Sequence, residues 1–279
     1  VTELAEMDGC PRRHVLERLA ALDGAHAAPD ADAAEPPEIV HAPGGAELGS
    51  EVHELLERMD FGTGAVPGSE FRVPRSRGRG PGSEPNGSEL ETRNSELGTA
   101  SAAKLVEKFL QSETAARLGR AQSDGRLLRE AELHLRLGES LISGSADVLV
   151  LEGGTRESPE RVFVLDYKTD RDAAADPERA RRRHELQVRL YALAARRAWP
   201  GAKVEAAIAF LSADRLAPVT VDDAALAAAE HRAGELLRML AGAELELVRG
   251  ELCEGCPEAI RAGCEVQHAD DSPQRCRGR

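Results

Sequence analysis

The sequence predicts a mixed α/β domain, and two observations lead to this prediction. The spacing of apolar residues changes from the helical period to the alternation of strands near residue 129, and it returns to the helical period near residue 176. The chain has 279 residues, of which 41% are hydrophobic, and this is enough to bury a sizeable core. Helices, then strands, a long helix, further strands and a last helix are the order expected of a sheet covered by helices.

Five helical segments are expected. In "GSEVHELLERMDFG" the residues Val52, Leu55, Leu56 and Met59 repeat at i, i+3, i+4 and i+7, which gives a helix with one apolar face. Similar spacing and capping residues place the other helices at 2–23, 99–119, 176–198 and 222–242.

Four or five strands are expected among these helices. "REAELHLRL" and "RVFVLDYK" alternate apolar and polar residues, and "SADVLVLE" also has the composition of a strand. Two more strands fit residues 204–211 and 216–221. We expect a single domain over residues 1–279, with flexible segments at about 24–46 and 62–98, where Gly, Pro and polar residues dominate.

The composition argues against several classes of function. A net charge of −13 is unfavourable for non-specific coating of nucleic acid or of anionic membranes, because both depend on attraction by the field of the whole protein. No apolar run approaches the roughly 18–20 residues that span a bilayer, and no secretion signal opens the chain. We therefore expect a soluble, cytoplasmic protein with no membrane partner. No Gly-rich phosphate loop is followed by Lys, so no ATPase site is expected in the chain.

Lysine is rare in this chain, which makes the lysine of "VFVLDYKTDR" a candidate for a chemical role. Four lysines stand against 32 arginines, so a base needed only for solvation would have been Arg. If residues 152–161 close an antiparallel hairpin, Asp147 lies directly opposite Asp166, with the Cβ atoms about 4.5–5.5 Å apart. Because side chains alternate with a period of two, Lys168 shares the face of Asp166. Two carboxylates and one ammonium group therefore converge.

This arrangement is suited to the hydrolysis of phosphodiester bonds. Two carboxylates so close together repel each other unless a cation lies between them. Mg²⁺ prefers carboxylate and water ligands, and a divalent cation lowers the pKa of water that it holds. Lys168 can then stabilise the charge that develops on a phosphate group. For "DYK" alone, a surface ion pair of little energetic value is the simpler alternative.

Segments in the same order along nearly the whole chain carry a family resemblance: "CPRRH", "GSEVHELLE", "GSADVLVLE", "VFVLDYKTD" and "ELQVRLYALA". They resemble the RecB-type branch of the PD-(D/E)xK nucleases, found at the C-terminus of RecB and of the AddA and AddB helicase-nuclease subunits. The Gly-to-His spacing of the second segment is one residue shorter than in the family. The resemblance implies a restriction-endonuclease-like core, in which helices flank a mixed central sheet, with a helical N-terminal segment and a Cys-bearing C-terminal tail.

The resemblance also implies a metal site. His53, Asp147 and Asp166 would bind Mg²⁺ or Mn²⁺ together with the main-chain carbonyl of Tyr167, and Lys168 would be the catalytic lysine. Taken alone, His53 would be interpreted as a partly exposed histidine on a helix. The family resemblance implies instead that it is a metal ligand.

Two further groups of residues are candidates. Gln187 and Tyr191 match the Gln-x-x-x-Tyr helix motif of the family, where the resemblance places them in the catalytic set. At i and i+4 they share one helix face that could reach DNA or the surroundings of the metal, and ordinary helix residues are the alternative. Glu130 or Glu132 in the first strand could add a carboxylate, and the sequence does not choose between them.

The five cysteines favour thiols or metal ligands over disulfides, because their number is odd and no secretion signal is present. "CEGCPEAIRAGC" has the spacing of metal ligands, and a Pro follows Cys in both "CPRR" and "CEGCP". The resemblance to AddB-type members implies a [4Fe-4S] cluster held by Cys10, Cys253, Cys256 and Cys264, with Cys276 as the substitute for the last ligand. Zn²⁺ and free thiols are the alternatives.

The predicted function is that of a metal-dependent DNA nuclease acting on single strands, as the nuclease domain of an ATP-dependent helicase-nuclease in double-strand-break repair. Its expected partners are DNA and a helicase domain or subunit. Two alternatives remain open, a free-standing iron-sulfur exonuclease of the CRISPR-adaptation type and a noncatalytic, cluster-stabilised DNA-binding subunit. Local arginines could contact phosphates, although charge runs are usually solvated faces. These are Arg72, Arg75, Arg77, Arg79, Arg179, Arg181, Arg182 and Arg183.

Overall fold

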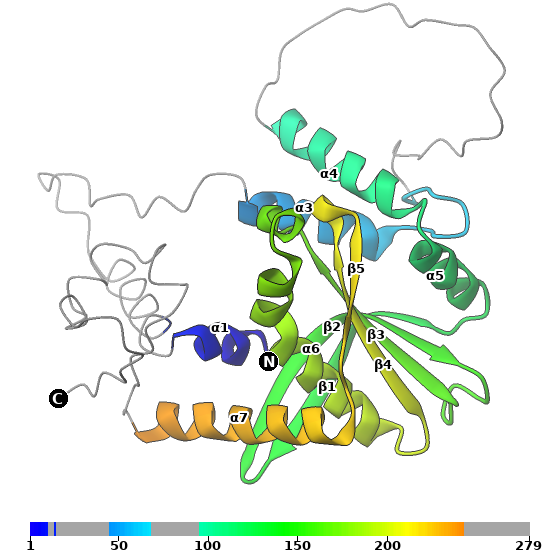
Figure 1. The fold of residues 1–279 in the computed structure, drawn as a ribbon. Coiled ribbons are helices and arrows are strands. Elements are labelled where there is room, and N and C mark those ends of the chain that lie inside the picture. Colours follow the sequence, from blue (N-terminus) through cyan, green and yellow to red (C-terminus); the bar gives the residue numbers. More distant parts are fainter. Residues whose placement is uncertain (11–13, 15–44, 68–94, 243–279) are drawn as a thin grey trace, which may run out of the picture.

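The computed structural model describes residues 1–10, 14, 45–67 and 95–242 (Figure 1). At its centre is one sheet with the strand order β1-β2-β3-β4-β5, in which β3 and β4 are parallel and the other neighbours are antiparallel. This is the mixed sheet that the sequence predicts. The strands are β1 (Leu127–Leu137), β2 (Ser140–Glu152), β3 (Arg161–Lys168), β4 (Lys203–Phe210) and β5 (Arg215–Val219).

Helices cover both faces of the sheet. One face packs against α3 (Gly45–Arg58), α4 (Ser95–Phe109) and α5 (Glu113–Ser123). The other face packs against α1 (Thr2–Gly9), α6 (Pro177–Ala198) and α7 (Asp223–Gly242). Helix α6 forms the crossover that a parallel pair such as β3 and β4 requires. Short 3₁₀ turns lie at Arg171–Ala174 and Leu211–Ala213. The arrangement is a restriction-endonuclease-like α/β fold.

The two faces are filled by alternate residues of the central strands. In β2, Val148 and Val150 belong to the core under α3, α4 and α5, whereas Leu149 and Leu151 belong to the core under α6. A strand buried on both faces reads as a continuous apolar run, which explains the composition of "VLVL".

The register of the β2–β3 hairpin is the predicted one. Leu151 pairs with Val162, and Glu152 pairs with Arg161. Of the turn between the strands, Gly153 and Gly154 both have positive φ, and Gly154 could not carry a side chain because its Cβ would lie 2.3 Å from the carbonyl oxygen of Ser158.

Several predicted boundaries differ from the observed ones. The helix predicted at 99–119 is two helices, because Ser112 caps a new one and accepts a hydrogen bond from the N–H of Ala115 at 3.1 Å. The flexible segment predicted at 62–98 overlaps α4, which begins at Ser95, and the segment predicted at 24–46 overlaps α3 by two residues. Strand β2 begins five residues before the predicted start at 145.

A cluster of hydrogen bonds ties the end of α3 to β1 and α5. Arg129 donates to the carbonyl of Met59 at 2.6 Å and to Oε1 of Gln122 at 2.8 Å. The amide of Gln122 donates in turn to Oδ1 of Asp60 at 3.0 Å and accepts from the N–H of Phe61 at 3.0 Å. Because α3 carries His53, this cluster fixes where that histidine approaches the sheet.

In the described part of the chain, no helix has the length and apolar character needed to cross a membrane.

Candidate active site

The site lies where β2 and β3 separate. Their ladder ends at the pair of Val148 with Leu165, and one more step of the same register brings Asp147 opposite Asp166. At that step the Asp147 side chain replaces the main chain as acceptor, because its Oδ2 takes a hydrogen bond of 2.6 Å from the N–H of Tyr167. Beyond this point β3 continues beside β4 alone.

His53 reaches the same point from α3. Its Nε2 lies 3.1 Å from the carbonyl oxygen of Tyr167, and its Nδ1 lies 3.6 Å from Oδ1 of Asp147. The imidazole also meets the Tyr167 ring edge-on, at 6.0 Å between centroids. The structure therefore brings together His53, Asp147 and the main-chain carbonyl of Tyr167, three of the four groups that the resemblance implies as metal ligands.

Glu130 of β1 joins this group. The pairs of Arg129 with Val148 and of Ala131 with Ala146 bracket it, so it lies opposite Asp147. Ligand atoms of His53, Glu130 and Asp147 all lie within 4.8 Å of one another, which is close enough to share one metal ion.

The backbone at Glu130 is unusual. Its φ of 43° lies in the left-handed region, which is uncommon for a residue other than Gly, and strain of this kind is found at functional sites. The hydroxyl of Ser145 donates to its Oε2 at 2.9 Å. Glu132, which is exposed like Glu130, is not part of the group, so the geometry favours Glu130 of the two candidates that the sequence leaves open.

Asp166 and Lys168 form the second half of the site. The Nζ of Lys168 lies 2.6 Å from Oδ2 of Asp166, and the aspartate is 1% exposed. Apart from this ion pair, neither carboxylate oxygen of Asp166 has a hydrogen-bond partner among the described residues. A buried carboxylate with so few partners is costly, and a divalent cation would satisfy it. Asp166 is not within the 4.8 Å group formed by the other three ligand candidates.

Electrostatics at the site fit a cation that is bound by oxygen and imidazole. Burial and the neighbouring Asp166 raise the pKa of Asp147 well above its usual value, against the opposing effect of Lys168. Burial and the charge of Lys168 lower the pKa of His53, so the imidazole is neutral and able to bind a metal at neutral pH. Burial lowers the pKa of Lys168, but the charges of Asp166 and Asp147 outweigh it, and the net pKa is raised. Carboxylate and carbonyl oxygens suit Mg²⁺ or Mn²⁺.

A sequence model of the PD-(D/E)XK nuclease superfamily matches residues 1–261. The chain belongs to this superfamily. Among solved structures, one titled "Crystal structure of SSO0001" aligns at 16% sequence identity and a TM-score of 0.31, covering 61% of this chain and 79% of that one. No curated protein matches the chain.

In this member of the superfamily, Gln187 and Tyr191 lie inside the protein. Both are buried, and the amide of Gln187 donates to the hydroxyl of Tyr191 and to Oγ1 of Thr2, each at 3.1 Å. Gly144 of β2 admits the Tyr191 ring, because an added Cβ would lie 3.1 Å from Cε1 of the ring. The pair shares a helix face as expected, but that face packs on α1 and the sheet. Its catalytic role stays a prediction.

The cysteines fall largely outside the described residues. Cys10 follows α1 and is buried. Cys253, Cys256, Cys264 and Cys276 are not among the described residues, so the predicted cluster is untested.

Replacing Asp147 by Asn should stabilise the metal-free protein. Because its pKa in the folded state is raised, ionisation of Asp147 costs stability as the pH rises from its unfolded to its folded pKa, and the cost is complete above both. Asn keeps the size and the acceptor for the N–H of Tyr167. In calorimetric unfolding with EDTA, Asp147→Asn should melt above the wild type at about pH 8, and the difference should shrink toward about pH 4.

The matched control for this prediction is Asp124→Asn, which makes the same chemical change at an exposed carboxyl. It should leave the melting temperature nearly unchanged. A lower melting temperature for Asp147→Asn at every pH would show that the carboxylate stabilises the metal-free fold, contrary to expectation.

Proposed function

We propose that this chain is a divalent-metal-dependent nuclease that hydrolyses phosphodiester bonds of single-stranded DNA. The observation that carries the proposal is the close group of His53, Glu130 and Asp147 beside the buried ion pair of Asp166 and Lys168. Membership of the PD-(D/E)XK nuclease superfamily supports the same chemistry.

Mg²⁺ or Mn²⁺ would be held by His53, Asp147 and Asp166 together with the carbonyl of Tyr167, and Glu130 would add a carboxylate. The few partners of Asp166 and the lowered pKa of His53 both favour a bound cation. When bound, the cation supplies Lewis-acid polarisation of the phosphate and activation of the attacking water. The chain itself contributes the geometry, because α3, β1, β2 and β3 each supply at least one of these groups.

Lys168 acts as a stabiliser of negative charge. Its raised pKa keeps the ammonium protonated at neutral pH, so it is unsuited to act as a general base. The ion pair with Asp166 restrains it, and it also lines a groove that leads away from the site. From that place it can neutralise charge that develops on a phosphate oxygen in the transition state.

Lys168→Ala and Asp166→Ala should each abolish cleavage while the protein remains folded. The loss of a preorganised charge stabiliser typically lowers the rate by about 10²–10³-fold, and loss of a metal ligand should cost at least as much. Cleavage of a labelled single-stranded oligonucleotide with Mg²⁺ or Mn²⁺ measures the effect. Lys203→Ala is the matched control, because Lys203 is an exposed lysine of β4 that pairs with Glu205. Wild-type rates in both site variants would refute the mechanism.

Glu130→Gln should weaken metal binding, whereas Glu132→Gln should not. Both residues lie on β1 and both changes remove one negative charge, but only Glu130 shares the group with His53 and Asp147. Titration calorimetry with Mn²⁺ in the absence of DNA should show affinity lower by about tenfold or more for Glu130→Gln. Equal weakening in both variants would point to general electrostatics, and unchanged binding in Glu130→Gln would exclude it as a ligand.

We also propose a [4Fe-4S] cluster held by Cys10, Cys253, Cys256 and Cys264, as the spacing of "CEGCP" and the resemblance to AddB-type nucleases suggest. Protein purified without oxygen should be brown and contain iron and sulfide. Cys253→Ser and Cys256→Ser should remove the colour, and Cys276→Ser should not. Zinc in place of iron, or no metal at these thiols, would reject the cluster.

The same resemblance supports placement of this nuclease in a helicase-nuclease that processes double-strand breaks. An ATP requirement for DNA degradation by the complete gene product and its partners would support this context. Degradation without ATP would favour the free-standing exonuclease.

A further inference from the structure

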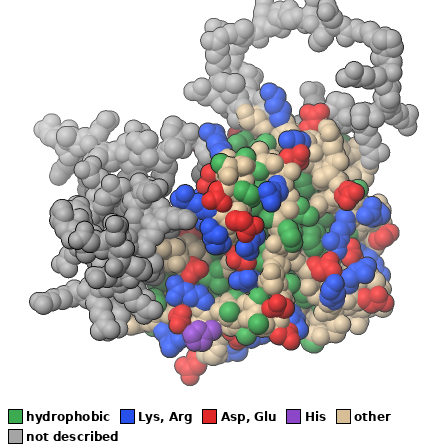
Figure 2. Space-filling view, viewed as in Figure 1, with side chains coloured by type: hydrophobic (Ala, Val, Ile, Leu, Met, Phe, Trp, Pro, Cys, Tyr) green, Lys and Arg blue, Asp and Glu red, His purple; other side chains and the backbone are tan. Residues whose placement is uncertain are grey.

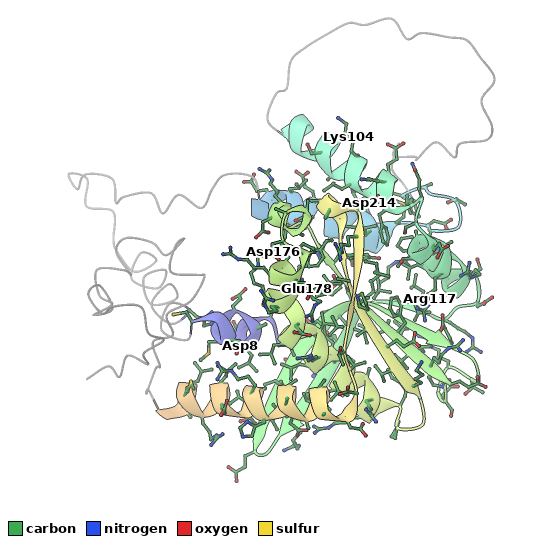
Figure 3. The ribbon with its side chains drawn as sticks, in the orientation of Figure 1. Asp8, Lys104, Arg117, Asp176, Glu178 and Asp214 are labelled. Atoms are coloured by element: carbon green, nitrogen blue, oxygen red, sulfur yellow. The ribbon has the colours of Figure 1, made fainter. Side chains whose placement is uncertain are left out.

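A groove of about 670 Å³ runs between α1 and the first half of α6 and reaches Lys168. Figure 3 marks the two helices by Asp8 on α1 and by Asp176 and Glu178 at the start of α6. The α6 side of the groove includes Arg179, Arg182, Arg183 and His184, and the α1 side includes Glu6 and Asp8.

The arginines on the α6 side share one helix face. Positions 179, 182 and 183 are related by i, i+3 and i+4 spacing, so their side chains lie near one another. The neighbouring Arg181 points elsewhere, since it forms ion pairs with Glu178 and Glu185 and does not line the groove. The arginine run that looks uniform in the sequence therefore divides into residues that face the groove and one that does not.

The groove holds cationic groups although its α1 side carries two acidic residues. Of these, Asp8 is paired with Arg232 of α7 at 2.5 Å, and Glu6 lies 3.5 Å from His14. On the α6 side, Arg182 is exposed and has no ion-pair partner among the described residues. A chain with a net charge of −13 thus presents local cationic groups beside its candidate active site.

Two other groups on the α6 side are held in place. Arg183 donates to both carboxylate oxygens of Asp172 at 2.6 Å, and the Nε2 of His184 lies 3.1 Å from Oδ2 of Asp170. A guanidinium has five N–H donors, so Arg183 keeps donors for a further acceptor. Groups fixed in advance lose little conformational entropy when they bind a ligand.

We propose that this groove is the track along which a single DNA strand reaches the active site, with Arg182 and Arg183 binding phosphates next to the one that is cleaved. The inference rests on the proposed nuclease function. Lys168 lies both in the groove and in the site, so a strand in the groove brings a phosphate to that ammonium. Phosphate contacts of this kind position a strand without reading its sequence.

The size of the groove is suited to a single strand. Pockets of about 300–1,000 Å³ accommodate a molecule of drug size, so a groove of about 670 Å³ has room for a short stretch of single strand. The face shown in Figure 2 mixes Lys and Arg with Asp and Glu, so the cationic groups of the groove are a local feature of the surface.

The test is the binding of a labelled oligothymidine to the full chain in EDTA, where no metal-dependent cleavage occurs. Each phosphate contact to a single strand contributes about 0.7 to the slope of log affinity against log salt, which corresponds to about fourfold in affinity at about 0.15 M salt. Arg182→Ala and Arg183→Ala should each weaken binding by about fourfold and lower the slope by about 0.7, and the double variant should lose about the product.

Arg120→Ala is the matched control, because Arg120 is an exposed arginine of α5 on the opposite face of the sheet. It should bind like the wild type, and all variants should melt within a few degrees of it. A duplex of equal length should bind more weakly than the single strand and should not respond to the two groove changes.

Wild-type affinity and salt slope in the Arg182→Ala/Arg183→Ala double variant would overturn the proposed track, as would tighter binding of the duplex or no binding by the wild type at low salt. These outcomes are separate from the nuclease proposal, because binding is measured without metal. If the wild type fails to cleave with Mg²⁺ or Mn²⁺ while the groove changes weaken binding, the nuclease proposal fails and the strand-binding groove stands.

Discussion

The site depends on one hydrogen bond, from the N–H of Tyr167 to the carboxylate of Asp147. This bond takes the place of the next rung in the β2–β3 ladder, so the main-chain donor is satisfied while the strands part. Without it, the strands would have to pair further or leave a buried N–H unpaired. The same bond fixes the carboxylate so that its other oxygen faces His53. One side chain therefore ends the ladder and orients a candidate ligand.

The remaining ligand candidates come from elements whose positions are fixed elsewhere. Helix α3 is tied through Asp60 and Arg129 to α5 and β1, so the approach of His53 is set by contacts at the far end of its helix. Glu130 follows Arg129 directly and adopts a left-handed backbone. The residue that holds α3 and the residue that turns toward the site are thus adjacent in β1. The positions of the imidazole and of the Glu130 carboxylate therefore depend on the same segment of β1.

The sequence alone predicts the features that are set by residues close together in the chain. The loop at 152–161 fixes the register that sets Asp147 opposite Asp166, because a hairpin with a known loop leaves one pairing. It was insufficient where the outcome depends on distant packing or on a backbone angle. Nothing near Gln187 indicates that α1 will cover it, since that contact joins residues 185 positions apart. Likewise, alternation along β1 treats Glu130 and Glu132 alike, and only the positive φ at Glu130 separates them.

Without a metal, repulsion between the carboxylates of Asp147 and Asp166 destabilises the folded protein, and the same repulsion favours the binding of a cation. Asp147 lies beside Asp166 in a largely buried place, and the ammonium group of Lys168 offsets the charge of the two carboxylates only in part. A fold selected only for stability would replace such a pair, because buried charges without full compensation are destabilising. Retaining them is reasonable when a divalent cation repays the cost on binding, since a ligand that binds only the folded state stabilises it by mass action. The charge of Lys168 then remains available for a phosphate, because the cation takes over part of its role beside Asp166.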